Sequence, residues 1–155
     1  MKRSIHSSVA KGLTFVLIVF SSLAYADSSN FLTYREKMMG AIGSHMKALS
    51  LIAKEGKDTP LLKHAAKHGQ ALKELAEISY DIFPVETKSL KSHAKPGIWD
   101  KQGLSKEFKE ELDKFKEAAD KVAALTKNND YTGVVKSLKT IGGSCKSCHN
   151  SFKSK

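Results

Sequence analysis

The 155-residue chain has little of the residue types that build disulfide-stapled, extended or all-β proteins. Two cysteines are too few for a disulfide scaffold, and 3 prolines and 10 glycines are too few for a collagen-like, linker-dominated or many-turned chain. Acidic residues are also scarce, 16 against 26 lysines and arginines, which gives a formal net charge of +10. Hydrophobic residues make up 41% and charged residues 27%, so we expect one folded globular domain.

The first 26 residues have the pattern of a secretory signal peptide. Three basic residues precede a mostly apolar stretch over residues 12–23, and Ala24-Tyr25-Ala26 puts small residues at the cleavage-site positions. An uncleaved membrane anchor is the alternative, but the apolar run is shorter than the ~20 residues of a spanning helix. We therefore expect residues 1–26 to be removed and residues 27–155 to form one domain exported to a bacterial periplasm. Its net charge is +7, because the three basic residues are lost.

Apolar residues recur at spacings of three and four along four later segments, which is the period of amphipathic helices. These segments cover residues 31–53, 61–80, 104–126 and 131–152. The polar cluster Asp27-Ser28-Ser29-Asn30 is a candidate cap for the first helix. No segment shows the alternating pattern of a strand. The pattern predicts an all-α fold, an antiparallel four-helix bundle with one longer crossover between the second and third helices.

The crossover, residues 84–103, contains two of the three prolines and the lone Trp99. A connection of this length is unusual in a compact domain and is often functional. We expect Trp99 to pin the crossover to the body of the protein, because a large aromatic side chain is costly to leave in water.

The last predicted helix contains the motif Cys145-Lys146-Ser147-Cys148-His149. C-x-x-C-H is the attachment signature of c-type haem, in which two thiols one helical turn apart bond to the porphyrin edge and the next histidine binds the iron. A thioredoxin-like redox motif would need a βαβ context, and a zinc site would need four ligands. A simple short disulfide would leave His149 without a role. We therefore expect one covalent haem c held by Cys145 and Cys148, with His149 as the proximal iron ligand.

The sequence resembles the class II c-type cytochromes, the cytochrome c prime family, over essentially the whole chain after residue 26. The resemblance rests on three segments, which are residues 141–153 around the C-x-x-C-H motif, residues 34–46 in the first helix, and Lys95-Pro96-Gly97-Ile98-Trp99 before the third. The first-helix segment is most similar to the low-spin branch of the family. The resemblance implies a monohaem four-helix bundle that exists as a monomer or a homodimer.

The second axial position of the iron determines what such a haem does. Met38, Met39 and Met46 lie on the first predicted helix, and periodicity alone does not choose between the first two, since both continue the apolar stripe. They could equally be ordinary core methionines. The family resemblance implies that Met39 is the distal ligand, because it lies four residues after Arg35. Arg35 itself is a candidate contact for a haem propionate, or an ordinary exposed helix residue.

The remaining histidines are weaker candidates. His45 is turned well away from Met39 on the same helix, and His93 lies in the crossover. His64 and His68, spaced i, i+4, could chelate a surface metal, although such a pair is more often a solvated face.

The predicted function is transfer of single electrons through a six-coordinate His/Met haem, without enzymatic turnover. The alternative is a five-coordinate, high-spin protein of the same fold that binds NO or CO, and a third class is a haem-free helical binding module. Lysines around the last helix would attract an acidic redox partner or simply keep the protein soluble. Nucleic-acid binding is disfavoured by the export signal and by the scarcity of arginine. The lysines are Lys136, Lys139, Lys146, Lys153 and Lys155.

Overall fold

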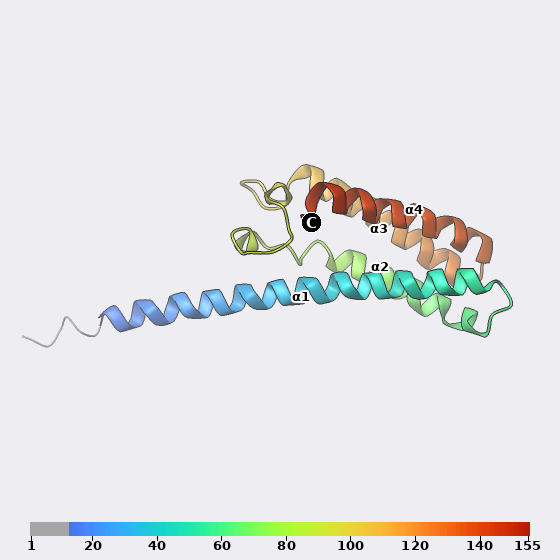
Figure 1. The fold of residues 1–155 in the computed structure, drawn as a ribbon, viewed down its shortest axis with the longest axis horizontal. Helices are drawn as coiled ribbons and strands as arrows, with labels where there is room; N and C mark the ends of the chain where they lie inside the picture. The colour runs from blue at the N-terminus through green and yellow to red at the C-terminus, as the bar shows by residue number, and fades with distance from the viewer. Residues whose placement is uncertain (1–12) are drawn as a thin grey trace, which may run out of the picture.

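The computed structural model describes the backbone of residues 13–155, and the side chains from residue 29 onward. Its four α-helices are α1 (Leu13–Glu55), α2 (Ala65–Ile78), α3 (Lys106–Lys127) and α4 (Tyr131–Phe152). No β-strand forms among these residues, where isolated bridges join Ala94 to Lys153 and Trp99 to Leu104. Consecutive helices pack against one another and α4 returns to α1, which closes a four-helix bundle (Figure 1). The predicted fold class is confirmed.

Helix α1 differs from the sequence prediction at its beginning. The Asp27–Asn30 cluster was expected to cap the helix, but in the full-length chain α1 is continuous from Leu13 through this cluster. The cluster contains neither proline nor glycine, the two residues that interrupt helices most strongly, so the helix can continue through it. The blue, N-terminal part of α1 extends beyond the bundle (Figure 1).

The predicted signal peptide therefore falls partly on residues 1–12, which lie outside the described residues, and partly on the first turns of α1. Among the residues that the structure describes, none of the helices combines the length and the apolar character required to cross a bilayer.

The other helix ends follow the expected chemistry. Ser105 precedes α3, and its side-chain oxygen accepts a hydrogen bond from the Phe108 amide at 3.3 Å. Asp130 precedes α4 and accepts from the Gly133 amide at 2.9 Å. Both are N-caps, each of which stabilises a helix by about 1 kcal/mol. The segment before α2 is tighter than predicted, because Pro60–His64 forms a 3₁₀ helix capped by Thr59 and the α-helix begins only at Ala65.

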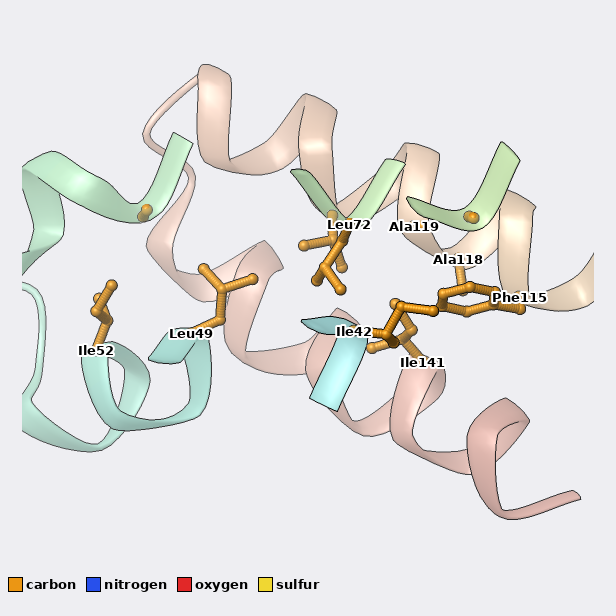
Figure 2. Packing of buried hydrophobic residues seen from close by; sticks show 11 residues of the cluster. Ile42, Leu49, Ile52, Leu72, Phe115, Ala118, Ala119 and Ile141 are labelled. Atoms are coloured by element: carbon orange, nitrogen blue, oxygen red, sulfur yellow. The ribbon is translucent and has the colours of Figure 1, made fainter. Parts of the chain in front are cut away.

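The main core lies where all four helices meet. Figure 2 shows Leu49 of α1 beside Leu72 of α2, with Phe115 of α3 and Ile141 of α4 near Ile42 of α1. Leu49, Leu72 and Ile141 are completely shielded from water. Burial of each such side chain contributes about 1.5–3 kcal/mol, so this cluster holds the helices in register.

A second apolar cluster lies at the end of the bundle covered by the crossover. It consists of Ile82, Phe83, Ile98, Trp99, Phe108 and Leu112. The Trp99 ring is buried, and its indole Nε1–H donates a hydrogen bond to the Phe83 carbonyl oxygen at 2.8 Å. The prediction that Trp99 pins the crossover is confirmed.

The crossover is also tied to the last turn of α4. The Lys95 amide donates to the Phe152 carbonyl at 2.9 Å, and the Ser154 amide donates to the His93 carbonyl at 2.8 Å. These bonds bring the middle of the crossover beside the C-x-x-C-H motif, although more than fifty residues separate them in the chain. The second apolar cluster and the end of α4 therefore enclose a common space.

Candidate haem-binding site

A cavity of about 460 Å³ lies between α1, α3, α4 and the crossover. Its apolar wall is formed by Met39, Phe83, Ala94, Ile98, Phe108, Leu112 and Phe152. Its polar wall is formed by Arg35, Glu36, Ser92, His93, Cys148, His149 and Lys153. The volume falls within the roughly 300–1,000 Å³ of small-molecule and cofactor sites, and a mostly apolar lining with a few polar groups is their usual character.

Helix α4 presents the C-x-x-C-H motif to this cavity. Cys148 and His149 line it, whereas Cys145, one turn earlier, is half-buried but not part of the lining. Neither thiol forms a disulfide. Because the motif is helical throughout, the two sulfurs are spaced three residues apart along one helix, as the sequence predicts.

The surroundings of the motif favour the uncharged forms of its two thiols and its imidazole. Burial raises the pKa of the Cys145 thiol. It also raises the pKa of the Cys148 thiol to about 11, with smaller contributions from the negative charge of Glu111 and from Cys145. For His149, burial and then the positive charge of Lys153 lower the pKa. Since iron binds the neutral imidazole, His149 is suited to act as a ligand at neutral pH.

Helix α1 forms the wall that carries the candidate distal ligand. Arg35 and Met39 are one turn apart, and both line the cavity. Met38 does not line it, although both methionines pack against the second apolar cluster. Met46 packs against the main core. The structure therefore brings Met39 to the cavity shared with His149 and does not bring Met38 or Met46 there.

Arg35 is a buried cation, 6% exposed. Its guanidinium donates to the Thr87 hydroxyl at 3.3 Å and to the Ser92 hydroxyl at 3.2 Å, and lies 5.0 Å from the centre of the Phe83 ring. Burial lowers its pKa, and the negative charge of Glu36 opposes this shift. Among the residues from 29 onward, no carboxylate lies within 4.0 Å of it.

A buried cation without an ion-pair partner is costly unless an anion approaches it. Arg35 lines the cavity, so a carboxylate on a bound group would complete the ion pair there. The apolar walls, the two thiols, the imidazole and this guanidinium together fit a haem, whose propionates are carboxylates. The residues present thus pass the structural test for this cofactor.

Two residues near the site were not singled out from the sequence. His93, expected only in the crossover, lines the cavity. Glu111 of α3 is 8% exposed and hydrogen-bonds Lys114 at 2.6 Å. The hydrogen bond from Lys114 lowers the pKa of this carboxyl, burial opposes the shift, and the nearby Ser147, inside the motif, lowers the pKa further. Glu111 lies three residues after Phe108 and four before Phe115 on the apolar stripe of α3, a position that could have identified it.

The other histidines lie away from the cavity. His45 of α1 and His68 of α2 contact one another, and His64 is exposed at the beginning of α2. None of the three lines the cavity. Over the described part of the chain, no cluster of three or more histidine, cysteine or acidic side chains is arranged to hold a metal ion.

Comparison with known proteins points to one protein family. The family model described as "Cytochrome C'" matches residues 30–153. The chain is 36% identical over 129 residues to cytochrome c' of Pararhodospirillum photometricum, covering 83% of this chain and 99% of that protein. It is 34% identical over 123 residues to cytochrome c-556 of Agrobacterium fabrum, covering 78% of this chain and 79% of that protein. The crystal structure of cytochrome c' from Rubrivivax gelatinosus superposes with a TM-score of 0.72 at 27% identity, covering 82% and 97% of the two chains.

A helical bundle with a C-x-x-C-H motif at its end and a cavity beside that motif defines a monohaem c-type cytochrome. The extent of the family match narrows this class further. The chain belongs to the cytochrome c' family, whose members are haem proteins that carry electrons or bind gases. Like the family, it binds one covalent haem c.

Proposed function

We propose that the protein is an exported electron-transfer cytochrome whose haem iron is bound by His149 and Met39. The observation that carries this proposal is the position of Met39 on the wall of the cavity that His149 also lines. Cys145 and Cys148 would form the thioether bonds, and Arg35 would pair with a propionate. When bound, the haem supplies a one-electron iron couple, and methionine with histidine as axial ligands raises its potential.

The chain's own residues would prepare the site for this chemistry. Phe83, Phe108 and Phe152 pack edge to face along the cavity, with ring centres 4.8 and 5.1 Å apart, and give it an apolar wall. The Thr87 and Ser92 hydroxyls hold the Arg35 guanidinium in one orientation. A well-packed, mostly apolar pocket of this kind would favour electron transfer, because little has to reorganise when the charge changes.

The second candidate is a five-coordinate, high-spin protein that binds NO or CO at the distal face. Three relatives of 30–36% identity are named cytochrome c', and solved structures of the same fold include nitric oxide complexes of cytochrome c prime from Alcaligenes xylosoxidans. Those structures, at 22% identity, support the fold alone. The two candidates differ only in whether Met39 binds the iron.

Substitution of Met39 by alanine tests the choice. We expect the wild-type protein to have a low-spin spectrum with little response to CO, and Met39→Ala to become high-spin and to bind CO. Met38→Ala is the matched control, because the neighbouring methionine lies outside the cavity, and it should keep the wild-type spectrum. A wild-type protein that is high-spin and binds CO as readily as Met39→Ala would exclude methionine ligation and support the gas-binding candidate.

The proposal also includes removal of residues 1–26 and covalent attachment of the haem. Cleavage after Ala26 would leave a domain of residues 27–155 that matures in the periplasm of a bacterium. The intact mass of protein purified from a cytochrome-maturing host measures both steps, since it should equal residues 27–155 plus one haem. Serine at Cys145 and Cys148 should abolish the haem increment without affecting cleavage, whereas a mass that still includes residues 1–26 would refute the processing step.

The surface around the last helix favours an acidic redox partner. All five lysines named above for this region are exposed, and Lys153 also lines the cavity. Positive charge beside the haem edge would attract a negatively charged protein and make the association rate fall with added salt. Measurement of the mass in solution would show whether the protein is a monomer or a homodimer.

A further inference from the structure

A pair of histidines, which are side chains that can bind metals, lies between α1 and α2, away from the haem cavity. His45 of α1 and His68 of α2 come from helices that run side by side (Figure 1). Their Nδ1 atoms are 2.9 Å apart, and their ring centres are 5.2 Å apart with a tilt of 57°. Both side chains are partly buried and so are held more firmly than free surface residues.

Two facing Nδ1 atoms at this distance share one proton in the metal-free protein, because one must donate and the other accept. The pKa of His68 is lowered first by burial and then by the positive charges that His45 and His64 can carry. His68 therefore tends to remain neutral, and a neutral imidazole is the form that binds metals.

The separation of the two nitrogens matches a particular coordination geometry. With metal–nitrogen bonds of about 2.0–2.1 Å, two ligands at adjacent corners of a square lie about 2.9 Å apart, and two ligands of a tetrahedron about 3.3 Å apart. The observed 2.9 Å is the length of the hydrogen bond in the metal-free pair, and the same separation would let both nitrogens occupy adjacent corners of a square without moving apart. Square or tetragonal nitrogen coordination is characteristic of Cu²⁺ and Ni²⁺, and Cu²⁺ is bound more tightly than the other first-row divalent metals.

We propose that His45 and His68 form a Cu²⁺ site that joins α1 to α2, with water completing the coordination. Binding requires that the shared proton move from Nδ1 to Nε2 of the donating ring, so that both Nδ1 lone pairs face the metal. No proton is released overall when both rings are neutral. No third histidine, cysteine or acidic side chain completes a cluster in the described residues, which leaves the remaining corners to water.

The site is independent of the proposed electron-transfer function. His45 follows Met39 by six residues, about 9 Å along the helix axis, and neither His45 nor His68 lines the haem cavity. Copper bound here would be a separate metal held on the surface of a haem protein. Either conclusion can therefore fail without affecting the other.

Calorimetric titration of Cu²⁺ into the haem-loaded ferric protein, in a non-coordinating buffer near neutral pH, tests the site. We expect one Cu²⁺ per chain and at least about tenfold weaker binding in His45→Ala and in His68→Ala. His64→Ala is the matched control, because this exposed histidine is one turn from His68 but outside the facing pair, and it should retain wild-type affinity. Zn²⁺ should bind less tightly than Cu²⁺.

Three results would overturn the proposal. One is wild-type affinity in His45→Ala together with loss in His64→Ala, which would assign the copper to the i, i+4 pair on α2. The second is absence of binding by the wild-type protein, or equal binding by all variants. The third is tighter binding of Zn²⁺ than of Cu²⁺. If His45→Ala fails to accumulate as folded haem protein, His45→Gln keeps a polar side chain without an imidazole and is measured in its place.

Discussion

The anchoring of the crossover by Trp99 makes a quantitative prediction about stability. Trp99→Phe keeps an aromatic ring but removes the Nε1–H that donates to the buried Phe83 carbonyl oxygen at 2.8 Å. An acceptor left without a partner in the interior costs about 1–3 kcal/mol, and the smaller ring adds the loss of part of the packing in the second apolar cluster. We expect a decrease in the free energy of unfolding of about 2–4 kcal/mol.

Urea denaturation of the haem-loaded protein, followed by circular dichroism, measures this effect. With a urea dependence of about 1–3 kcal/mol per molar, the midpoint should fall by about 1–2 M. Tyr34→Phe is the control, because it also removes a polar group from an aromatic side chain, but Tyr34 is 46% exposed, and it should change the stability by less than about 0.5 kcal/mol. A Trp99→Phe midpoint equal to that of Tyr34→Phe would show that the hydrogen bond does not anchor the crossover.

Two further predictions concern the contact between α2 and α3 and the carboxyl beside the haem motif. A Cβ at Gly69 would lie 2.2 Å from the Thr126 hydroxyl oxygen, so Gly69→Ala should lower the free energy of unfolding, measured by urea denaturation, by about 1–3 kcal/mol. Gly43→Ala is the control, because a Cβ there would have nothing within 4 Å, and it should be neutral or stabilising. Equal effects of the two substitutions would refute the close approach of α2 and α3 at Gly69. The hydrogen bond from Lys114 is the main cause that lowers the pKa of Glu111. The carboxylate should therefore stabilise the fold above the unfolded-state pKa of about 4.3 and lose this contribution as the pH falls through the lower folded-state pKa. Glu111→Gln should be less stable than wild type at pH 7 by a margin that shrinks as the solution is acidified below about pH 4, and a deficit independent of pH would contradict this reasoning.

The parts of the fold that sequence could predict are those set by local pattern. The three/four spacing of apolar residues predicted the four helices, and Asp130 predicted the cap of α4 because short acidic side chains accept bonds from free helix amides. The long connection with its lone tryptophan predicted a crossover held to the bundle by Trp99. Each of these features depends on residues close together in the chain.

The parts that sequence could not predict depend on contacts between distant segments. His93 lines the cavity only because the crossover is hydrogen-bonded to the end of α4, and no local pattern contains that pairing. The contact between His45 and His68 likewise requires the relative rotation of α1 and α2. The predicted start of α1 was wrong for a different reason, since the polar cluster contains no proline or glycine to interrupt the helix, which begins at Leu13 and continues through it.

The position of Met39 shows how such a distant contact distinguishes two neighbouring residues. Met38 and Met39 differ by about 100° around α1. Ile42 follows one by four residues and the other by three, so both methionines fit the apolar stripe that contains Ile42. Arg35 orients this part of α1, because its buried guanidinium is held by the Thr87 and Ser92 hydroxyls of the crossover. Both methionines lie about one turn after Arg35, but Met39, four residues later, is closer to it in rotation, and it is the methionine that lines the cavity. The residue proposed to pair with a propionate thus also sets the rotation of α1 that presents the proposed iron ligand.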